Sequence, residues 1–208
     1  MNLDELAAIE RLKSIQSYGS RLRSAVRALW TGEWTWETAY NEFRAAIERE
    51  FTNAWHEGLR EVGLTPEDMT DEERLQLLQM IIQESNYIAA YLDAIEENSK
   101  ENGGALDPLL TRVDLWVKRY TNVKNQALQS AANDPVLEWV TNADESCPSC
   151  LKMNGQRRRS SVFARLDIRP QHPRKLECMV SAGGVDVCKC ELVPTDQRPS
   201  RGRLPKLP

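Results

Sequence analysis

Apolar residues in the first 134 positions recur every three or four residues, which is the spacing of one face of an α-helix. The pattern predicts helices over residues 2–18, 20–30, 36–62 and 70–97, with Gly19 between the first two. A fifth helix is predicted to begin at Asp107-Pro108 and to end at Asn133-Asp134-Pro135. The fourth of these is predicted to turn the following residues inward: Leu75, Leu78, Ile82, Ile88, Tyr91, Leu92 and Ile95. Because these residues are mostly large and aliphatic, the front of the chain should form a packed helical core.

Local signals mark where these helices begin and end. Thr35 is a suitable N-cap for the third helix, and Gly63 stands where a glycine commonly follows a helix. Thr70 and Glu73 have the spacing of a capping box, in which each side chain bonds the other residue's backbone N–H. These signals agree with the apolar spacing, so we expect the helix ends to be well defined.

After residue 134 the pattern changes. Val136–Val140 alternates and is rich in β-forming residues, which predicts a strand, and Asn154-Gly155 is typical of a two-residue hairpin turn. Residues 195–208 are rich in proline and arginine and poor in apolar residues, which predicts a flexible tail. The expected fold is mainly α, with an acidic helical domain (1–134), a small β-ribbon module (135–194) and a disordered basic tail (195–208).

Charge follows the same division. Residues 1–150 hold 14 Lys and Arg against 26 Asp and Glu, a net charge of −12, whereas residues 151–208 hold 13 against 5, a net charge of +8. The consecutive Arg157, Arg158 and Arg159 are candidate contacts for an anionic partner, either DNA or an acidic protein surface. Because no base-reading element can be assigned, any DNA contact would be non-specific and sensitive to salt.

All five cysteines lie after residue 146, and Cys147 and Cys150 form a CxxC pair. Two thiolates at this spacing can converge on one zinc ion, which indicates structural zinc. Redox chemistry would need a helix after the pair, and residues 151–160 do not read as one. Disulfides would need an oxidising compartment. Structural zinc is the interpretation that we favour among these three.

The ligands that we predict are Cys147, Cys150, Cys178 and Cys188, with Cys190 as an alternate and His172 as an outside candidate. A metal makes physical sense because residues 144–193 contain few large apolar residues to offset the entropy of folding. Four thiolates leave no open coordination position, so the zinc would stabilise the fold rather than catalyse a reaction.

Other function classes lack their motifs. The two histidines, His56 and His172, are far apart in the sequence, and there is no nucleophile–base motif, phosphate-binding glycine loop or HExxH pair, so we expect no enzyme. No apolar run approaches the roughly 20 residues that span a bilayer. Because Met1–Glu5 lacks the features of a signal peptide, we expect a reducing, cytoplasmic compartment and no membrane partner.

The cysteine region resembles the C-terminal part of the phage Mu F-like minor head proteins, also called phage head morphogenesis proteins. The residues that carry the resemblance are Trp139-Val140-Thr141, Asp144-Glu145, Cys147 and Cys150, Met153-Asn154-Gly155, a proline-rich loop, Cys178, Cys188-Lys189-Cys190-Glu191-Leu192 and Pro194. The similarity extends over roughly residues 108–195. It departs from the family at Val185, where a histidine often stands three residues before the C-x-C pair, and Cys178 would take that ligand role.

The resemblance implies a structural or assembly protein of a virion. Proteins of this family are thought to associate with the portal or the inner capsid shell early in head assembly, in the host cytoplasm, and several copies would be present. The partners implied are capsid or portal proteins, with non-specific contact to packaged DNA as a further expectation. The alternative function is a zinc-ribbon protein that binds nucleic acid or regulates expression; its mark would be an exposed face of basic and aromatic residues.

Overall fold

The computed structural model describes residues 3–141, 146–171 and 189–207. Over these residues the chain is mainly helical, with six α-helices and a three-stranded antiparallel sheet. The elements are α1 (Leu3–Trp30), α2 (Trp36–Glu61), the 3₁₀ helix η1 (Pro66–Asp68), α3 (Asp71–Glu97), α4 (Leu106–Ser130), β1 (Val136–Val140), α5 (Pro148–Met153), β2 (Arg157–Arg159), α6 (Ser160–Leu166) and β3 (Glu191–Pro194).

The chain forms two compact units. We call Met1–Thr52 with Leu78–Arg119 the helical unit, and Asn53–Leu77 with Tyr120–Pro208 the cysteine unit. The division differs from the sequence-based boundary at residue 134, because the last turns of α2 and α4 pack with the cysteine-bearing segment. Helices α2, α3 and α4 therefore contribute residues to both units.

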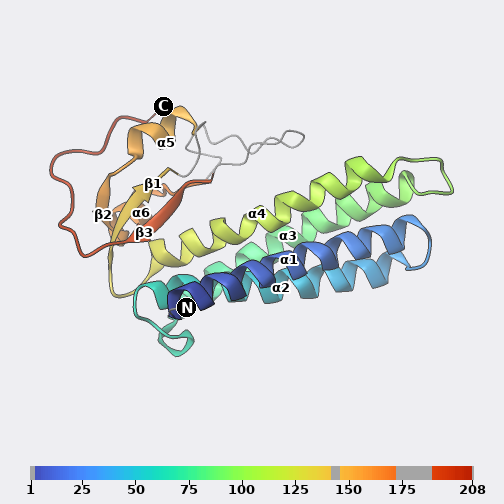
Figure 1. Ribbon diagram of the computed structural model, residues 1–208, viewed down its shortest axis with the longest axis horizontal. Coiled ribbons are helices and arrows are strands. Elements are labelled where there is room, and N and C mark those ends of the chain that lie inside the picture. The colour runs from blue at the N-terminus through green and yellow to red at the C-terminus, as the bar shows by residue number, and fades with distance from the viewer. Residues whose placement is uncertain (1–2, 142–145, 172–188, 208) are drawn as a thin grey trace. The chain divides into compact units, whose positions relative to one another are not determined.

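In the helical unit, α1 and parts of α2, α3 and α4 lie side by side (Figure 1). Phe43, Tyr91 and Trp116 form an aromatic group at its core, with ring centroids 4.9–5.9 Å apart. The buried Tyr91 hydroxyl donates a hydrogen bond of 2.5 Å to the Leu109 carbonyl, so its polar end is satisfied. These residues come from three of the predicted helices, and their burial confirms that the helices share a core.

Helix α1 is continuous through Gly19, so the predicted interruption is wrong. A Cβ at this position would lie 3.2 Å from Cγ2 of Val117 on α4 and 2.9 Å from an Arg23 guanidinium nitrogen. The glycine thus lets α1 and α4 approach closely. Glycine inside a helix costs about 0.5–1 kcal/mol relative to alanine, and the surrounding packing offsets this cost.

The apolar face predicted for α3 is wrong in its first half. Leu75, Leu78 and Ile82 are 54%, 51% and 56% exposed, whereas Leu77 and Ile81 are buried together with Ile88, Tyr91, Leu92 and Ile95. The buried stripe contains Glu84, which is also buried and pairs with Arg119 at 3.2 Å. Glu84 occupies a core position, so the buried side of α3 is interrupted by a charged residue. The exposed Leu75, Leu78 and Ile82 also have helical spacing, and the sequence pattern therefore selected them as the buried side.

Glu84 lies in a buried polar group of the helical unit. Burial raises the pKa of Glu84 above its usual value, and the neighbouring Arg119 guanidinium partly opposes this shift. Burial also raises the pKa of Tyr18, with the negative charges of Glu84 and Glu50 adding to the effect. Each of the four long helices therefore contributes a polar residue to this group: Tyr18, Glu50, Glu84 and Arg119.

The predicted signals for helix starts and for the end of α2 are confirmed. Thr70 accepts a hydrogen bond of 3.2 Å from the Glu73 backbone N–H, and the Thr70 N–H donates to the Glu73 carboxylate at 2.7 Å. Thr35 accepts from the Thr38 backbone N–H at 3.2 Å. Gly63 has a φ of +75°, the conformation that glycine adopts most readily.

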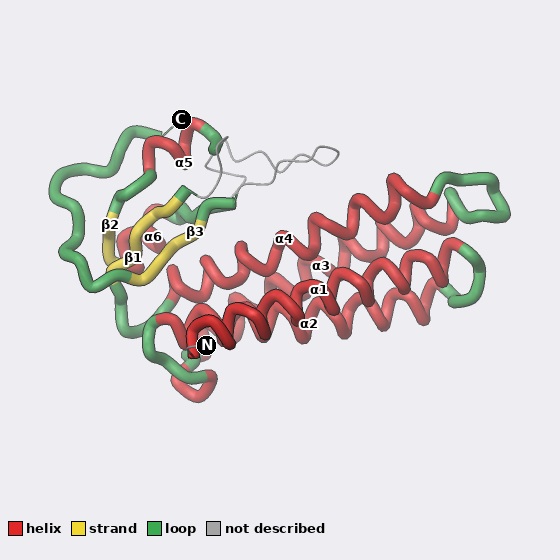
Figure 2. The backbone as a smooth tube through the Cα atoms, viewed as in Figure 1, coloured by secondary structure: helices red, strands yellow, loops and turns green. Residues whose placement is uncertain are grey.

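The sheet of the cysteine unit has the strand order β2-β1-β3, with both pairings antiparallel (Figure 2). In the β1–β2 pair Leu137 lies opposite Arg158, and in the β1–β3 pair Trp139 lies opposite Leu192. Leu137, Trp139 and Leu192 are fully buried, so one face of the sheet covers the core. The predicted strand over 136–140 is confirmed as the central strand.

The Asn154-Gly155 turn forms, but it does not join two strands as a hairpin. Asn154 has φ −52° and ψ 130°, Gly155 has φ +73°, and the Gln156 N–H donates to the Met153 carbonyl at 2.9 Å. This is a type II turn that connects α5 to β2. The prediction failed because a short helix precedes the turn, and the partner of β2 is β1.

Gly58 permits close contact between α2 and α4 inside the cysteine unit. An added Cβ would lie 2.8 Å from the Ala127 Cβ and 2.9 Å from the Lys124 carbonyl oxygen. We expect Gly58→Ala to lower the free energy of unfolding by about 1–3 kcal/mol, because backbone atoms cannot yield and the strain exceeds the gain in helix propensity. Urea denaturation measures this, with Gly19→Ala as a comparison in which the new Cβ meets side-chain atoms of Arg23 and Val117 rather than backbone, so the loss should be smaller. Equal stability for Gly58→Ala and the wild type would contradict the prediction.

Candidate metal centre

Cys147 and Cys150 lie at the start of the six-residue helix α5. Cys147 is the N-cap residue, and its sulfur accepts a hydrogen bond of 3.4 Å from the Cys150 backbone N–H. Pro148 occupies the first turn, where the missing N–H is no loss. Cys147 is half-buried and Cys150 is fully buried, so this short helix holds both sulfurs at the inner side of the module.

Cys190 approaches the same place from the other end of the module. It directly precedes β3, whose pairing with β1 fixes its position, and it is fully buried. The Ser146 hydroxyl lies 3.7 Å from the Cys190 sulfur, which brings the residue before the CxxC pair next to Cys190. The CxxC pair and Cys190, which are far apart in the sequence, thus lie in one region.

One apolar core holds these thiols. Cys150 and Cys190 are buried with Leu128, Leu137, Trp139, Met153, Phe163, Ile168 and Leu192, and Cys147 packs against this group. Trp139 and Phe163 contact each other with ring centroids 6.0 Å apart. The core is small, as the sequence predicted, although α6, which carries Phe163, was not expected from the sequence.

The remaining predicted ligands, Cys178 and Cys188, lie outside the described residues, as does His172. Within the described residues, no three Cys, His, Asp or Glu side chains form a group that could hold a metal ion. The alternate ligand, Cys190, is the cysteine of the later pair that the structure does describe, and it lies beside the CxxC segment.

The donor set fits a structural zinc ion. Sulfur ligands from two separate segments would cross-link α5 to β3, and two of the three described cysteines, Cys150 and Cys190, are fully buried. Cys147, Cys150 and Cys190 all carry thiols in this structure. Helix α5 ends at Met153, so the longer helix that a thioredoxin-like redox motif would need does not follow the pair.

Polar residues of α4 hold the module in place, and sequence reasoning missed them. The buried Asn125 accepts a hydrogen bond of 2.9 Å from the Leu192 N–H of β3. Gln129 donates to the Ile168 carbonyl at 2.9 Å, and Asn122 donates to the Gln171 carbonyl at 3.1 Å. Asn and Gln on a helix usually face solvent. The one signal in the sequence is that these residues alternate with the apolar Val123, Ala127 and Leu128, which indicates that this side of the helix is buried.

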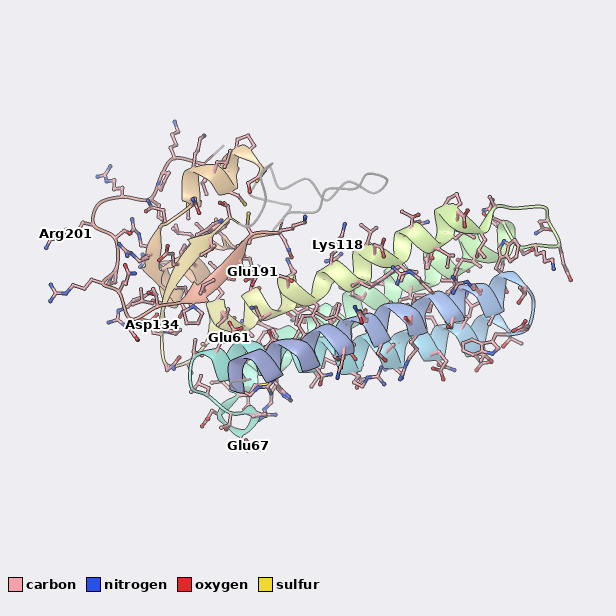
Figure 3. The ribbon with its side chains drawn as sticks, viewed as in Figure 1. Glu61, Glu67, Lys118, Asp134, Glu191 and Arg201 are labelled. Atoms are coloured by element: carbon pink, nitrogen blue, oxygen red, sulfur yellow. The ribbon has the colours of Figure 1, made fainter. Side chains whose placement is uncertain are left out.

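An ion cluster fastens β3 to the helices of the cysteine unit. The Lys124 ammonium, 3% exposed, lies 3.0 Å from Glu61, 3.2 Å from Glu191 and 3.9 Å from Glu57. The Tyr120 hydroxyl donates to Glu57 at 2.6 Å. Figure 3 labels Glu61 on α2 and Glu191 on β3, the two carboxylates that accept hydrogen bonds from the Lys124 ammonium.

The three candidate arginines differ in their surroundings. Arg158 is buried and donates to the carbonyls of Ser200 and Gly202 and to the Gln156 side chain. Arg157 is half-buried, whereas the Arg159 side chain is 59% exposed and lies 3.8 Å from Asp134. Of the three, Arg159 is therefore the one that offers most of its side chain to a partner.

Residues 195–207 contain no helix or strand, yet they contact the module. The Ser200 N–H donates to the Arg157 carbonyl at 2.8 Å, and Leu204 and Leu207 pack against the apolar core. The sequence predicted a flexible segment here, because Leu204 and Leu207 alone are too few to indicate packing. Arg198, Arg201, Arg203 and Lys206 are exposed along this segment, and Figure 3 labels Arg201.

No protein-family model matches the chain, and comparisons with curated proteins and with solved structures find no match either. No helix among the described residues is both long and apolar enough to cross a membrane.

Proposed function

We propose that this chain is a head-assembly protein of a phage or prophage virion, similar to the minor head proteins. In this proposal the helices make protein contacts in the capsid or portal region, in several copies per particle. The cysteine unit carries a structural zinc ion that keeps an irregular module in one shape. The protein would be found in the virion, and in the host cytoplasm during assembly.

One observation carries this proposal. The separate segments that bear the resemblance, residues 139–155 and 190–194, pack into one apolar core through Trp139, Cys150, Met153, Cys190 and Leu192. A shared core is what a two-segment zinc module requires, because both cysteine segments must reach one ion. The contact between Ser146 and Cys190 further supports a shared metal centre at their meeting point.

The proposed zinc ligands are Cys147, Cys150 and Cys190, completed by Cys178 or Cys188. The burial of Cys190 next to the CxxC segment supports Cys190 as a ligand, beside Cys178 or Cys188, which lie outside the described residues. Zinc supplies a rigid cross-link between four thiolates and, with no open position, no catalysis. We accordingly propose a structural protein rather than an enzyme.

The alternative is a zinc-ribbon protein that binds nucleic acid, and the exposed cations of residues 198–206 favour it. Proteins that bind single strands usually stack bases on exposed aromatic rings. Trp139 and Phe163 are both fully buried, so these two rings are not available for stacking. A basic surface without such rings suits a phosphate backbone or an acidic protein surface equally well.

Quantitative mass spectrometry of purified particles tests the proposal. We expect the chain to sediment with heads at a fixed ratio to the portal protein, both in DNA-filled heads and in DNA-free precursors. Recovery of the chain only in the free-protein fraction would contradict it. Association with filled heads alone, lost after nuclease treatment or in high salt, would favour the nucleic-acid alternative.

A further inference from the structure

The outer face of α3 carries no charge over more than four turns. Over residues 75–92, all of which the structure describes, the exposed positions are Leu75, Leu78, Gln79, Ile82, Gln83, Asn86, Tyr87 and Ala90. The charged residue in this stretch, Glu84, points into the core, and exposed charges resume at Arg74 and Asp93. Such a face is unusual in a chain of which 28% of the residues are charged.

The face contains an apolar seam. Leu75, Leu78 and Ile82, at spacings of three and four, are more than half exposed, and the same spacing continues through the small residues Ser85 and Ala89. This is the arrangement by which one helix packs along another. Three large aliphatic side chains in one exposed row also form the kind of patch that marks an interaction surface.

The seam is self-complementary in size when two copies run antiparallel. All three large residues lie in its first half and the small residues lie in its second half. If two α3 helices are related by a twofold axis level with Met80, Leu78 lies opposite Ile82 of the other copy, and Leu75 lies opposite Ser85. A parallel pair would instead place Leu75 against Leu75 and Ser85 against Ser85, which leaves the second half poorly filled.

The charge distribution also favours a second copy of this chain as the partner of the α3 face. A twofold contact places each surface against itself, so any charged face would meet its own charge, and like charges in contact are destabilising. The front of this chain has a net charge of −12 over residues 1–150, so most of its helix surface would repel a second copy. The neutral face of α3 avoids this repulsion, and its amide side chains both donate and accept hydrogen bonds.

We propose that α3 docks on α3 of a second copy of this chain, antiparallel, through Leu75, Leu78 and Ile82. This inference is independent of the virion function proposed above, since a dimer could form in either case. The buried layers would be Leu78 against Ile82, formed twice about the twofold axis, with Leu75 over Ser85 at each end.

Sedimentation of the full chain with charged variants tests the proposal. We expect the wild type to form dimers of the 23.7 kDa chain. Leu78→Glu and Ile82→Lys should each raise the dimer dissociation constant at least about a hundredfold, because each buries two unpaired charges. Leu151→Glu, which changes an equally exposed leucine (57%) on α5, should leave the dimer unchanged.

Mixing the two charged variants distinguishes an antiparallel α3–α3 pair from other arrangements of the dimer. In the mixture, the carboxylate introduced by Leu78→Glu in one chain faces the ammonium introduced by Ile82→Lys in the other. The second layer stays Leu78 against Ile82, so a heterodimer close to the wild type in affinity should form. A parallel pair would place each introduced charge against an aliphatic side chain, Glu against Leu78 and Lys against Ile82, so its heterodimer would stay far weaker than the wild type. A monomeric wild type, a Leu78→Glu dimer as tight as the wild type, or a mixture that stays monomeric would each overturn the proposal; circular dichroism verifies that the variants keep their helices.

Discussion

Removal of the proposed zinc ion should unfold the β-ribbon module (135–194) while the helical unit stays folded. Structural zinc contributes about 10–16 kcal/mol of apparent binding free energy in small modules, which exceeds the stability that a core of this size provides alone. Hydrogen exchange reports the two regions separately. After chelation we expect the amides of β1, β2 and β3 to lose protection, whereas the buried positions of α1 and of α3 around Tyr91 should keep theirs.

Serine variants test the proposed zinc ligands one residue at a time. Elemental analysis of the purified wild type should give about one zinc per chain, and Cys147→Ser and Cys150→Ser should lose it. Cys178→Ser, Cys188→Ser and Cys190→Ser, made one at a time, identify the remaining ligands. A zinc-free wild type whose strand amides are already protected would refute the metal centre, although the helical unit and the α3 contact would be unaffected.

Lys124→Met should destabilise the cysteine unit by about 3 kcal/mol. The substitution removes the cation that three carboxylates share and leaves Glu57, Glu61 and Glu191 close together without it. Breaking one side of a buried ion pair commonly costs about 3–5 kcal/mol, and we take the lower end because the carboxylates are partly solvated. Urea denaturation measures the loss.

Two further variants distinguish the ion cluster from simple packing. Lys118→Met changes a lysine on the same helix and should alter the free energy of unfolding by less than about 0.5 kcal/mol. Adding Glu191→Gln to Lys124→Met should restore part of the lost stability, because one of the crowded negative charges is removed. If Lys124→Met unfolds at the same urea concentration as the wild type, the cluster contributes nothing to stability.

The long helices could be predicted because their information is local. The Thr70–Glu73 capping box and the glycine after α2 act within a few residues, and both are confirmed. Apolar spacing located the helices, although it gave the wrong buried face for the first half of α3. The errors occurred where a distant partner decides. The sequence predicts a helix break at Gly19 because it does not reveal that Val117 of α4 packs beside this position. It favours a solvent-exposed Glu84 because it does not reveal the ion pair with Arg119.

The candidate site shows the same limit. The CxxC pair and the strand at 136–140 were visible in the sequence, because both are short-range patterns. The position of Cys190 depends on the pairing of β1 with β3, and β3 is also held by Asn125, whose side-chain oxygen accepts a hydrogen bond from the Leu192 N–H. A side chain that satisfies backbone groups 67 residues away leaves no periodic signal in the sequence.

The pairing of β1 with β3 also affects the order in which the chain can fold during synthesis. Residues of the helical unit end at Arg119, so that unit is complete on the ribosome long before Leu192 is made. The central strand β1 emerges soon afterwards, but its partner β3 and the packing residues Leu204 and Leu207 come much later in the chain. Contacts of such long range form slowly. Until synthesis has passed Leu207, the thiols of Cys147 and Cys150 are therefore carried on an incomplete module, exposed to cellular metals and oxidants.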